Sequence, residues 1–158
     1  MEGKKTGPNP TDRAKQGTKR SLLTEGNGLP VGLTVCGANT HDKWMVAETL
    51  ERMPLEPPST GHVAQHLCMD KGYDYEDVRQ TVAECGYVPQ ILARGEERKK
   101  KRRSPRYRAR RWVCERTHSW LNRFRRILIR WEKKVANYEA MLHFACAYIC
   151  YSAAAVLG

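Results

Sequence analysis

The sequence predicts an α/β fold in which helices flank a mixed β-sheet. Two short segments rich in Leu, Val and Thr lie near the N-terminus, with GNG between them. Further short apolar segments alternate with amphipathic helical patterns, and two long helical patterns finish the chain. The predicted order is therefore β-β-α-β-α-β-α-α. A hairpin followed by alternating strands and helices forms a mixed sheet with helices packed against it.

The first half of the chain contains the predicted hairpin and one helix. Residues 18–25 (TKRSLLTE) and 29–36 (LPVGLTVC) are the two expected strands, joined by a glycine-assisted turn. GANTHDK breaks this pattern, and Thr40 or Asp42 is expected to cap a helix through residues 45–53. The closely spaced prolines of PLEPPSTG then predict a loop, because proline cannot continue a helix.

The second half alternates strands with helices before the two long helical patterns. HLCMD (66–70) is a short apolar strand that ends in an acid, and YEDVRQTVAEC is an amphipathic helix stopped by Gly86. YVPQILA (87–93) is a further strand, in which Pro89 favours an edge position. Helical patterns follow at about 107–131 and 135–157.

The chain of 158 residues is long enough for one domain with a sizeable core. We expect four parts within it. Residues 1–17 would form an N-terminal extension, 18–93 the sheet and its helices, 94–106 a basic linker and 107–158 the C-terminal helices.

Positive charge is concentrated in one segment. Residues 94–134 hold 18 Lys and Arg against 4 Asp and Glu, whereas the other 117 residues hold 10 against 13. A charge gathered in this way marks a surface where a polyanion docks. Nucleic acid is the first candidate and a membrane surface the second.

Other features of the sequence indicate a cytosolic protein. MEGKKTGPNP lacks the apolar stretch of a signal peptide, and the six cysteines form no C-x-x-C, so we expect reduced, buried thiols. The run MLHFACAYICYSAAAVL is interrupted by His143 and preceded by Glu139. A membrane span needs about 20 strongly apolar residues, so this run is expected to be a core helix.

Two acids stand out by their positions. Asp70 follows a predicted strand, and ligands bind at the carboxyl ends of strands in open α/β sheets. Glu115 lies inside RWVCERTHSWLNRFRR, the most basic helical pattern, where a bare carboxylate would repel a phosphate backbone. A divalent metal bound between the Glu115 carboxylate and the phosphate would remove this repulsion, since Mg²⁺ takes oxygen ligands. A structural interpretation stays open, with Asp70 as a turn or cap residue and Glu115 in a surface ion pair.

Four segments taken in order resemble the transposases of bacterial insertion sequences. They are GKKTGPNPTDRAKQGTKRSLLTEGNGLP, GANTHD, MDKGYD and RWVCERTHSWLNRFRR. The resemblance covers nearly the whole chain, from residue 3 to about residue 150. The resemblance is to the DDE class, which implies a ribonuclease-H-like fold and strand cleavage and transfer with Mg²⁺ or Mn²⁺. It implies that Asp70 is the second acid of the catalytic set. Arg111 and Glu115 would form the family's R-x-x-x-E signature, with Glu115 as the third acid.

The family's first acid lies on a strand upstream of the GKKTGPNPTDR-like segment, so we expect that strand and its Asp to be absent here. Asp12 and Glu25 are nearby acids, but neither occupies the motif position. A missing strand would leave a sheet edge open, and we therefore expect the chain alone to aggregate or to need a partner.

The resemblance also implies a surface for double-stranded DNA. The candidate contacts are Arg108, Arg111, Arg123, Arg125 and Arg126 together with Lys99, Lys100, Lys101, Arg102 and Arg103. Arg108 and Asn122 stand where the family's wider signature has Tyr and Lys, so Tyr107, Arg123 and Arg125 are expected to replace those contacts. His41 and Asp42 in GANTHD either support the site or serve as a helix cap and its neighbour. Trp112, Trp120, Phe124 and Trp131 fall near one helical face, which favours core packing over base stacking.

The leading hypothesis is a transposase catalytic-domain fragment that acts on element ends and target DNA in the bacterial cytoplasm, near the nucleoid. A homo-oligomer, or completion by the product of an upstream reading frame, is compatible with it. The alternatives are a truncated remnant that only binds DNA and an RNA-binding protein that uses the basic tract.

Overall fold

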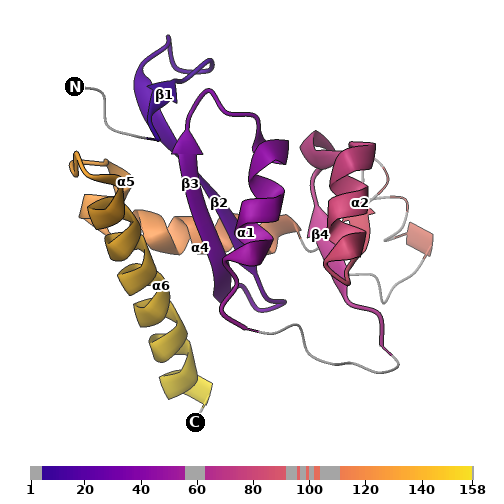
Figure 1. The fold of residues 1–158 in the computed structure, drawn as a ribbon. Coiled ribbons are helices and arrows are strands. Elements are labelled where there is room, and N and C mark those ends of the chain that lie inside the picture. Colours follow the sequence, from indigo (N-terminus) through magenta and orange to yellow (C-terminus); the bar gives the residue numbers. More distant parts are fainter. Residues whose placement is uncertain are drawn as a thin grey trace.

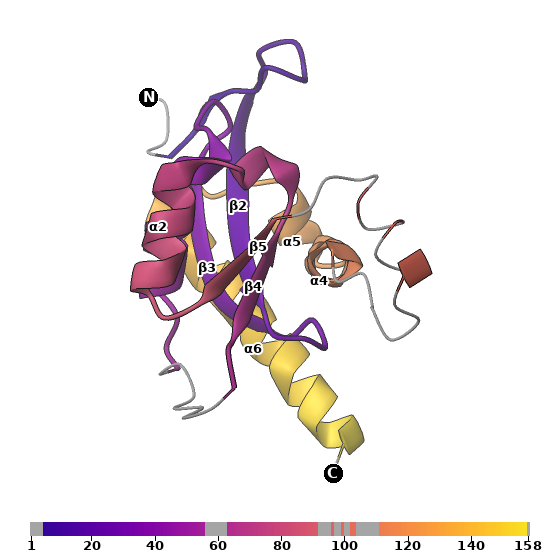
Figure 2. The same cartoon turned by 90° about the vertical axis from the view of Figure 1, so that its right-hand side faces the viewer.

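The structure is a computed structural model that describes residues 5–55, 63–91, 96, 99, 102–103 and 111–157. Its strands and helices form layers, as Figure 2 shows: α2 (Glu76–Glu84) lies on one side of the strands, and α4 (Arg111–Asn122) with α5 (Arg125–Leu128) lies on the other. This arrangement confirms the predicted α/β class.

An antiparallel sheet is built from the N-terminal part of the chain. Its order is β1 (Gly7–Pro8), β2 (Gln16–Thr24) and β3 (Pro30–Gly37), with Thr18 opposite Gly37 and Leu22 opposite Leu33. The predicted hairpin is therefore confirmed. The short β1, within the segment expected to be an extension, pairs with the start of β2.

A second sheet contains two parallel strands, β4 (His66–Met69) and β5 (Val88–Ile91), with His66 opposite Val88. The connection between them contains the 3₁₀ turn η2 (Lys71–Tyr73) and α2. Helix α2 ends at Glu84, and Gly86 stops it as predicted, with a φ of +83° that suits a residue without a side chain. Among the described residues β5 pairs only with β4, as an edge strand does.

The region between the sheets begins with η1 (Asp42–Met45) and α1 (Val46–Glu51). The prediction that Thr40 or Asp42 caps the helix over residues 45–53 was wrong. His41 caps η1, the turn that leads into α1: its Nδ1 accepts a hydrogen bond from the Lys43 amide at 3.3 Å. The Asp42 carboxylate accepts instead from Lys19 Nζ at 2.9 Å.

The predicted single helix over 107–131 is divided in its described part. Helix α4 ends at Asn122, Phe124 is extended (φ −82°, ψ 103°), and α5 follows. The break turns Ile127 into the core, where only 2% of the residue is exposed. Residues 107–110 lie outside the described part of the chain. Helix α6 (Val135–Leu157) has the predicted bounds.

Two cores hold these layers together. One gathers Leu33 and Val35 of β3 against Leu121, Leu142 and the neighbouring apolar residues of α4, α5 and α6. The other lies under α1 and α2, where Leu23 of β2 and both Leu67 and Met69 of β4 contact the buried residues of the two helices. The two sheets thus share one helical layer (Figure 1), although no ladder joins β2 to β4 in the described ranges.

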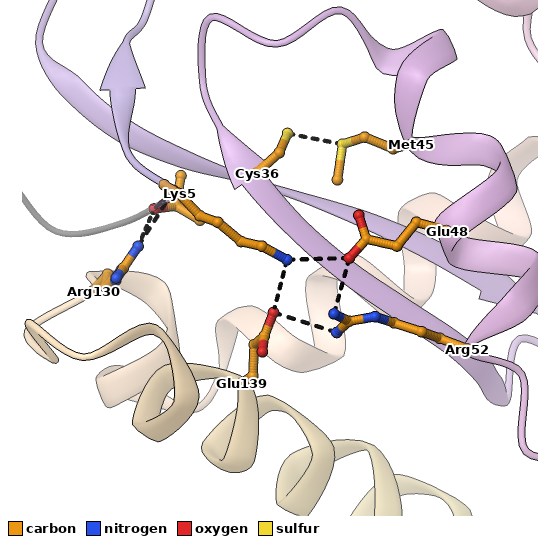
Figure 3. Close-up of polar contacts among 8 residues, drawn as sticks. Lys5, Cys36, Met45, Glu48, Arg52, Arg130 and Glu139 are labelled. Carbon is orange, nitrogen blue, oxygen red and sulfur yellow. Dashed lines mark hydrogen bonds and ion pairs between the residues drawn. The ribbon is translucent and has the colours of Figure 1, made fainter.

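A charged cluster connects the N-terminal segment to two helices (Figure 3). Lys5 Nζ lies 3.1 Å from Glu48 of α1 and 3.3 Å from Glu139 of α6, and Arg52 contacts the same two carboxylates at 2.9 and 3.4 Å. Arg130 donates a hydrogen bond to the Lys5 carbonyl. Partly exposed pairs contribute modestly one by one, so their main effect here is to fix three segments in one place.

Helix α6 is a core helix along one face. Leu142, Ala145 and Ile149 are buried, whereas Phe144, Tyr148 and Tyr151 on the other face are exposed. Within the described ranges, no helix combines the length and the apolar character that crossing a membrane requires. The six cysteines are free thiols and are only partly buried, less than predicted.

Candidate active site and basic surface

Asp70 lies at the strand end that the sequence predicts. It follows β4 directly, and its Oδ1 accepts a hydrogen bond from the Gly72 amide at 2.8 Å, which caps η2. A Cβ at Gly72 would lie 2.9 Å from that oxygen, so glycine makes this turn possible. The structural role considered for Asp70 is therefore observed. Its residue is exposed, and in the described part of the chain Oδ2 accepts no hydrogen bond.

Glu115 projects from the opposite side of α4 to the residues that hold the helix in place. Val113, Thr117 and Leu121 form the buried stripe of α4, at a spacing of four residues. Two residues from either Val113 or Thr117 correspond to about 200° around a helix, so Glu115 points outward. It is exposed and forms no ion pair with any described residue, despite the arginines around it in the sequence.

Tyr73 lies in η2, three residues after Asp70, and is partly buried. Burial raises its pKa above the usual 10, and the negative charges of Asp42 and Asp70 raise it further. Tyr73 is thus within electrostatic range of both Asp70 and Asp42. On α4, the Sγ of Cys114, the residue before Glu115, lies 3.5 Å from Thr24 Oγ1 at the end of β2.

The chemistry of these side chains suits a hard divalent cation, but their number is small. Carboxylate oxygens are the ligands that Mg²⁺ prefers, and neither Asp70 nor Glu115 is neutralised by a cationic side chain within the described ranges. Among the same residues, no three His, Cys, Asp or Glu side chains gather closely enough to hold a metal. Asp70 and Glu115 would therefore supply only part of a ligand set.

His41 and Asp42 have structural partners beside this region. His41 caps η1, its Nε2 lies 3.5 Å from the Tyr75 hydroxyl, and the two rings meet edge to face at 5.5 Å. Asp42 pairs with Lys19 at 2.9 Å. The cap and its neighbour, one of the two interpretations of GANTHD, are thus observed with the two residues in exchanged roles. The turn η1 that begins with Asp42 also contacts η2, which contains Tyr73.

The predicted DNA contacts fall into three groups. Lys100, Lys101 and Arg108, and the side chain of Arg111, lie outside the described part of the structure. Lys99, Arg102 and Arg103 are described and exposed. Arg123 and Arg125 are exposed and have no ion pair there, whereas Arg126 pairs with Glu132 at 3.1 Å. Asn122, at the position of the family's lysine, accepts a hydrogen bond from Arg20 at 2.7 Å.

The prediction of core packing for the aromatic residues was wrong for two of them. Trp112 and Trp131 are 51% and 71% exposed, while Trp120 and Phe124 pack against the core. Trp131 lies beyond the break that ends α4. Trp112 is held instead by Arg116, whose guanidinium carbon lies 4.5 Å from the centre of the Trp112 ring and 4.8 Å from that of Trp120.

Sequence reasoning missed Arg116 and Thr117, the two residues after Glu115. The Thr117 hydroxyl donates to the Gly28 carbonyl at 2.6 Å, and Arg116 Nη2 donates to the Asn27 carbonyl. Both acceptors are backbone atoms 89 positions away, so no motif could identify them. The spacing of Trp112, Arg116 and Trp120 by four residues was the one available signal, since it places them on one helical face.

Comparison with known proteins gives the class of this chain. The model of the family described as "Transposase DDE domain" matches residues 2–150. The chain therefore belongs to the DDE transposases. It is also 37% identical over 151 residues to a Burkholderia cepacia protein described as "Putative transposase for insertion sequence element IS402", a match that covers 94% of this chain and 69% of the relative. No solved structure matches the chain significantly.

Proposed function

We propose that this chain performs metal-dependent cleavage and transfer of DNA strands in the transposition of an insertion sequence, acting on double-stranded DNA in the bacterial cytoplasm. Family membership supports the reaction class. The observation that carries the proposal is Glu115, an exposed carboxylate that has no ion pair in the described residues although it lies in the most basic segment.

Asp70 and Glu115 would hold Mg²⁺ or Mn²⁺. When bound, the metal would activate a water or a 3′-hydroxyl and stabilise the leaving oxygen of the scissile phosphate. The protein positions the two carboxylates: the Gly72 amide orients Asp70, and α4 carries Glu115. Arg111 would orient Glu115 or contact a phosphate. His41 and Asp42 would support the site from the adjacent turn.

A ribonuclease-H-like arrangement is the fold we propose for this catalytic domain. Its support is the shared helical layer, since side chains of β2 and β4 reach the same core under α1 and α2. An extended segment between these strands would join the two sheets into one mixed sheet. A second copy of the chain or an upstream product could provide it.

The DNA backbone would be bound by the basic segment, with Arg123 and Arg125 among its exposed members that form no ion pair in the described part. Such contacts position the protein on DNA without reading its sequence. Lys99, Arg102 and Arg103 would extend this surface. We therefore expect the chain to bind duplex DNA with little sequence specificity.

Nicking of supercoiled plasmid DNA with and without Mg²⁺ tests the proposal. Glu115→Gln and Asp70→Asn should each lower the nicking rate by at least about 100-fold, because even partners that only orient a metal ligand contribute about 10–100-fold. DNA binding should persist in both variants. The matched control is Glu84→Gln, which changes an exposed helical glutamate whose bond is to Gln80 on the same helix.

Three results would decide between the hypotheses. Normal nicking by Glu115→Gln would remove Glu115 from the reaction. Loss of nicking in Glu84→Gln as well would show a general effect of charge. DNA binding without any nicking by the unmodified chain would support the inactive remnant, an alternative that the family match over residues 2–150 does not favour.

A further inference from the structure

We propose that Thr117 and Arg116 are positioning residues, which bind α4 to the β2–β3 turn and thereby place the Glu115 carboxylate. This inference rests on the proposed role of Glu115 as a metal ligand. It gives the turn over residues 25–29 a role in positioning the site, and family membership alone does not indicate this role.

The β2–β3 turn is held in one shape by its own hydrogen bonds. The Glu25 carboxylate accepts from the amides of Asn27 at 2.7 Å and Leu29 at 2.9 Å, and also from the Asn27 side chain at 3.1 Å. The Gly28 amide donates to the Glu25 carbonyl at 2.9 Å, and Gly28 has a φ of +88°. These bonds leave the carbonyls of Asn27 and Gly28 as acceptors for α4.

Helix α4 contributes two adjacent donors to these carbonyls. The residue Thr117 is completely buried, and its hydroxyl lies 2.6 Å from the Gly28 carbonyl oxygen and 3.1 Å from that of Val113. Arg116 reaches the Asn27 carbonyl with its guanidinium stacked between Trp112 and Trp120. The stack restricts the rotamers of a long side chain, so less conformational entropy is lost when the hydrogen bond forms.

The fit between turn and helix is close. A Cβ at Gly28 would lie 2.9 Å from Arg116 Nη2 and 3.1 Å from Thr117 Oγ1. Cys114, one residue before Glu115, adds the contact with Thr24 at 3.5 Å. Contacts to the hairpin therefore flank Glu115 on both sides in the sequence.

These contacts matter because Glu115 has no bond of its own to any described side chain. The position of its carboxylate then depends on where α4 lies. Binding and catalytic groups have to be held within about 0.5 Å of a productive geometry. A helix that slides or rotates on the hairpin would move Glu115 relative to Asp70, which is held separately by η2.

Terbium luminescence provides a test that does not depend on nicking. Tb³⁺ is a hard cation that binds oxygen ligands and is excited by a nearby tryptophan, and Trp112 lies one helical turn before Glu115. The full chain is titrated with Tb³⁺, with Mg²⁺ as competitor. Glu115→Gln should raise the dissociation constant strongly, and Trp112→Phe should lower the luminescence at saturating Tb³⁺, because it removes the nearby tryptophan.

Thr117→Val tests the positioning role, because valine has the shape of threonine without the hydroxyl donor. We expect the dissociation constant of Tb³⁺ to rise about tenfold, as for partners that orient a metal ligand. Thr117→Ser retains the donor and should bind Tb³⁺ like the unmodified chain. Thr49→Val is the matched control: Thr49 is also buried and also bonds to a carbonyl four residues earlier, but it lies on α1.

The outcomes separate the two proposals. Unchanged Tb³⁺ binding by Thr117→Val, together with loss in Glu115→Gln, would overturn the positioning role and leave the proposed function intact. Unchanged binding by Glu115→Gln, or no binding by the unmodified chain, would overturn both. An equal rise in the Tb³⁺ dissociation constant of Thr49→Val would show that Thr117 acts only through the stability of the fold. That result would overturn the positioning role.

Arg116→Lys gives a second measurement if Thr117→Val does not fold. Lysine keeps the charge but loses the planar group that stacks between the two tryptophans, and at such a site the two residues are not interchangeable. The dissociation constant of Tb³⁺ should again rise several-fold. A value equal to that of the unmodified chain would overturn the proposal.

Discussion

At the scale of single residues, the two proposed metal ligands belong to the exposed acids that form no ion pair in the described residues, a group that also includes Glu76 and Glu84. Asp42, Asp74 and Asp77 each pair with a Lys or Arg within 3.1 Å. Asp70 and Glu115 have no such partner among the described residues, although the chain carries a formal charge of +11.

His118, one residue after Thr117, provides a pH-dependent probe of how α4 packs against the rest of the fold. Burial lowers its pKa below 6.5, and the positive charge of Arg20 lowers it further. The unfolded chain therefore binds a proton at higher pH than the folded one. The free energy of unfolding therefore has its full value with respect to His118 above pH 6.5, and it falls as the pH drops from 6.5 toward the pKa of His118 in the folded state.

We therefore expect the free energy of unfolding to decrease between pH 6.5 and 5.5, with a slope of at most about 1.4 kcal/mol per pH unit from this residue. His118→Gln should flatten that part of the curve in urea titrations at several pH values. His143→Gln, at an exposed position on α6, should keep the slope of the unmodified chain. An unaltered slope in His118→Gln would show that the imidazole is not desolvated.

At the scale of elements, local patterns predicted most of the fold. The hairpin, the order β4–α2–β5 and helix α6 follow from alternating or helical apolar spacing and from glycine at the ends. The break at residues 123–124 was missed because it depends on where Ile127 packs. The attachment of α4 to the β2–β3 turn was also missed, because it depends on tertiary contacts: the hydrogen bonds of Arg116 and Thr117 go to backbone atoms of a turn distant in the sequence. The positions of Asp70 after a strand and of Glu115 on a helix were predictable from the sequence.

Helix α6 should tolerate change on one face only. Leu142 is completely buried between β3 and the C-terminal helices, so Leu142→Ala should lower the free energy of unfolding by about 2–5 kcal/mol. Phe144 is 75% exposed, and Phe144→Ala should change it by less than about 0.5 kcal/mol. Urea unfolding of both variants measures the difference. A large cost for Phe144→Ala would mean that this face is covered in solution.

At the scale of the whole molecule, most of the positive charge lies in the same continuous part of the chain as Glu115. The 18 Lys and Arg of residues 94–134 surround Glu115, while the other residues carry more acids than bases. A polyanion is attracted to the basic segment and repelled elsewhere, which would bring its phosphates to the carboxylate that the hairpin turn holds. Binding and metal chemistry then depend on different side chains and can be separated.

The salt dependence of DNA binding tests this separation. If about six of the basic residues contact phosphates, the logarithm of the affinity should fall against the logarithm of salt concentration with a slope of about −5. Arg123→Gln or Arg125→Gln should each make the slope shallower by about 1, whereas Lys15→Gln in the β1–β2 loop should leave it unchanged.

Glu115→Gln should bind DNA at least as tightly as the unmodified chain, because it removes a negative charge from the basic surface. A slope near zero would exclude the basic segment as the DNA contact, and tighter binding of duplex RNA than of duplex DNA at the same salt concentration would favour an RNA partner.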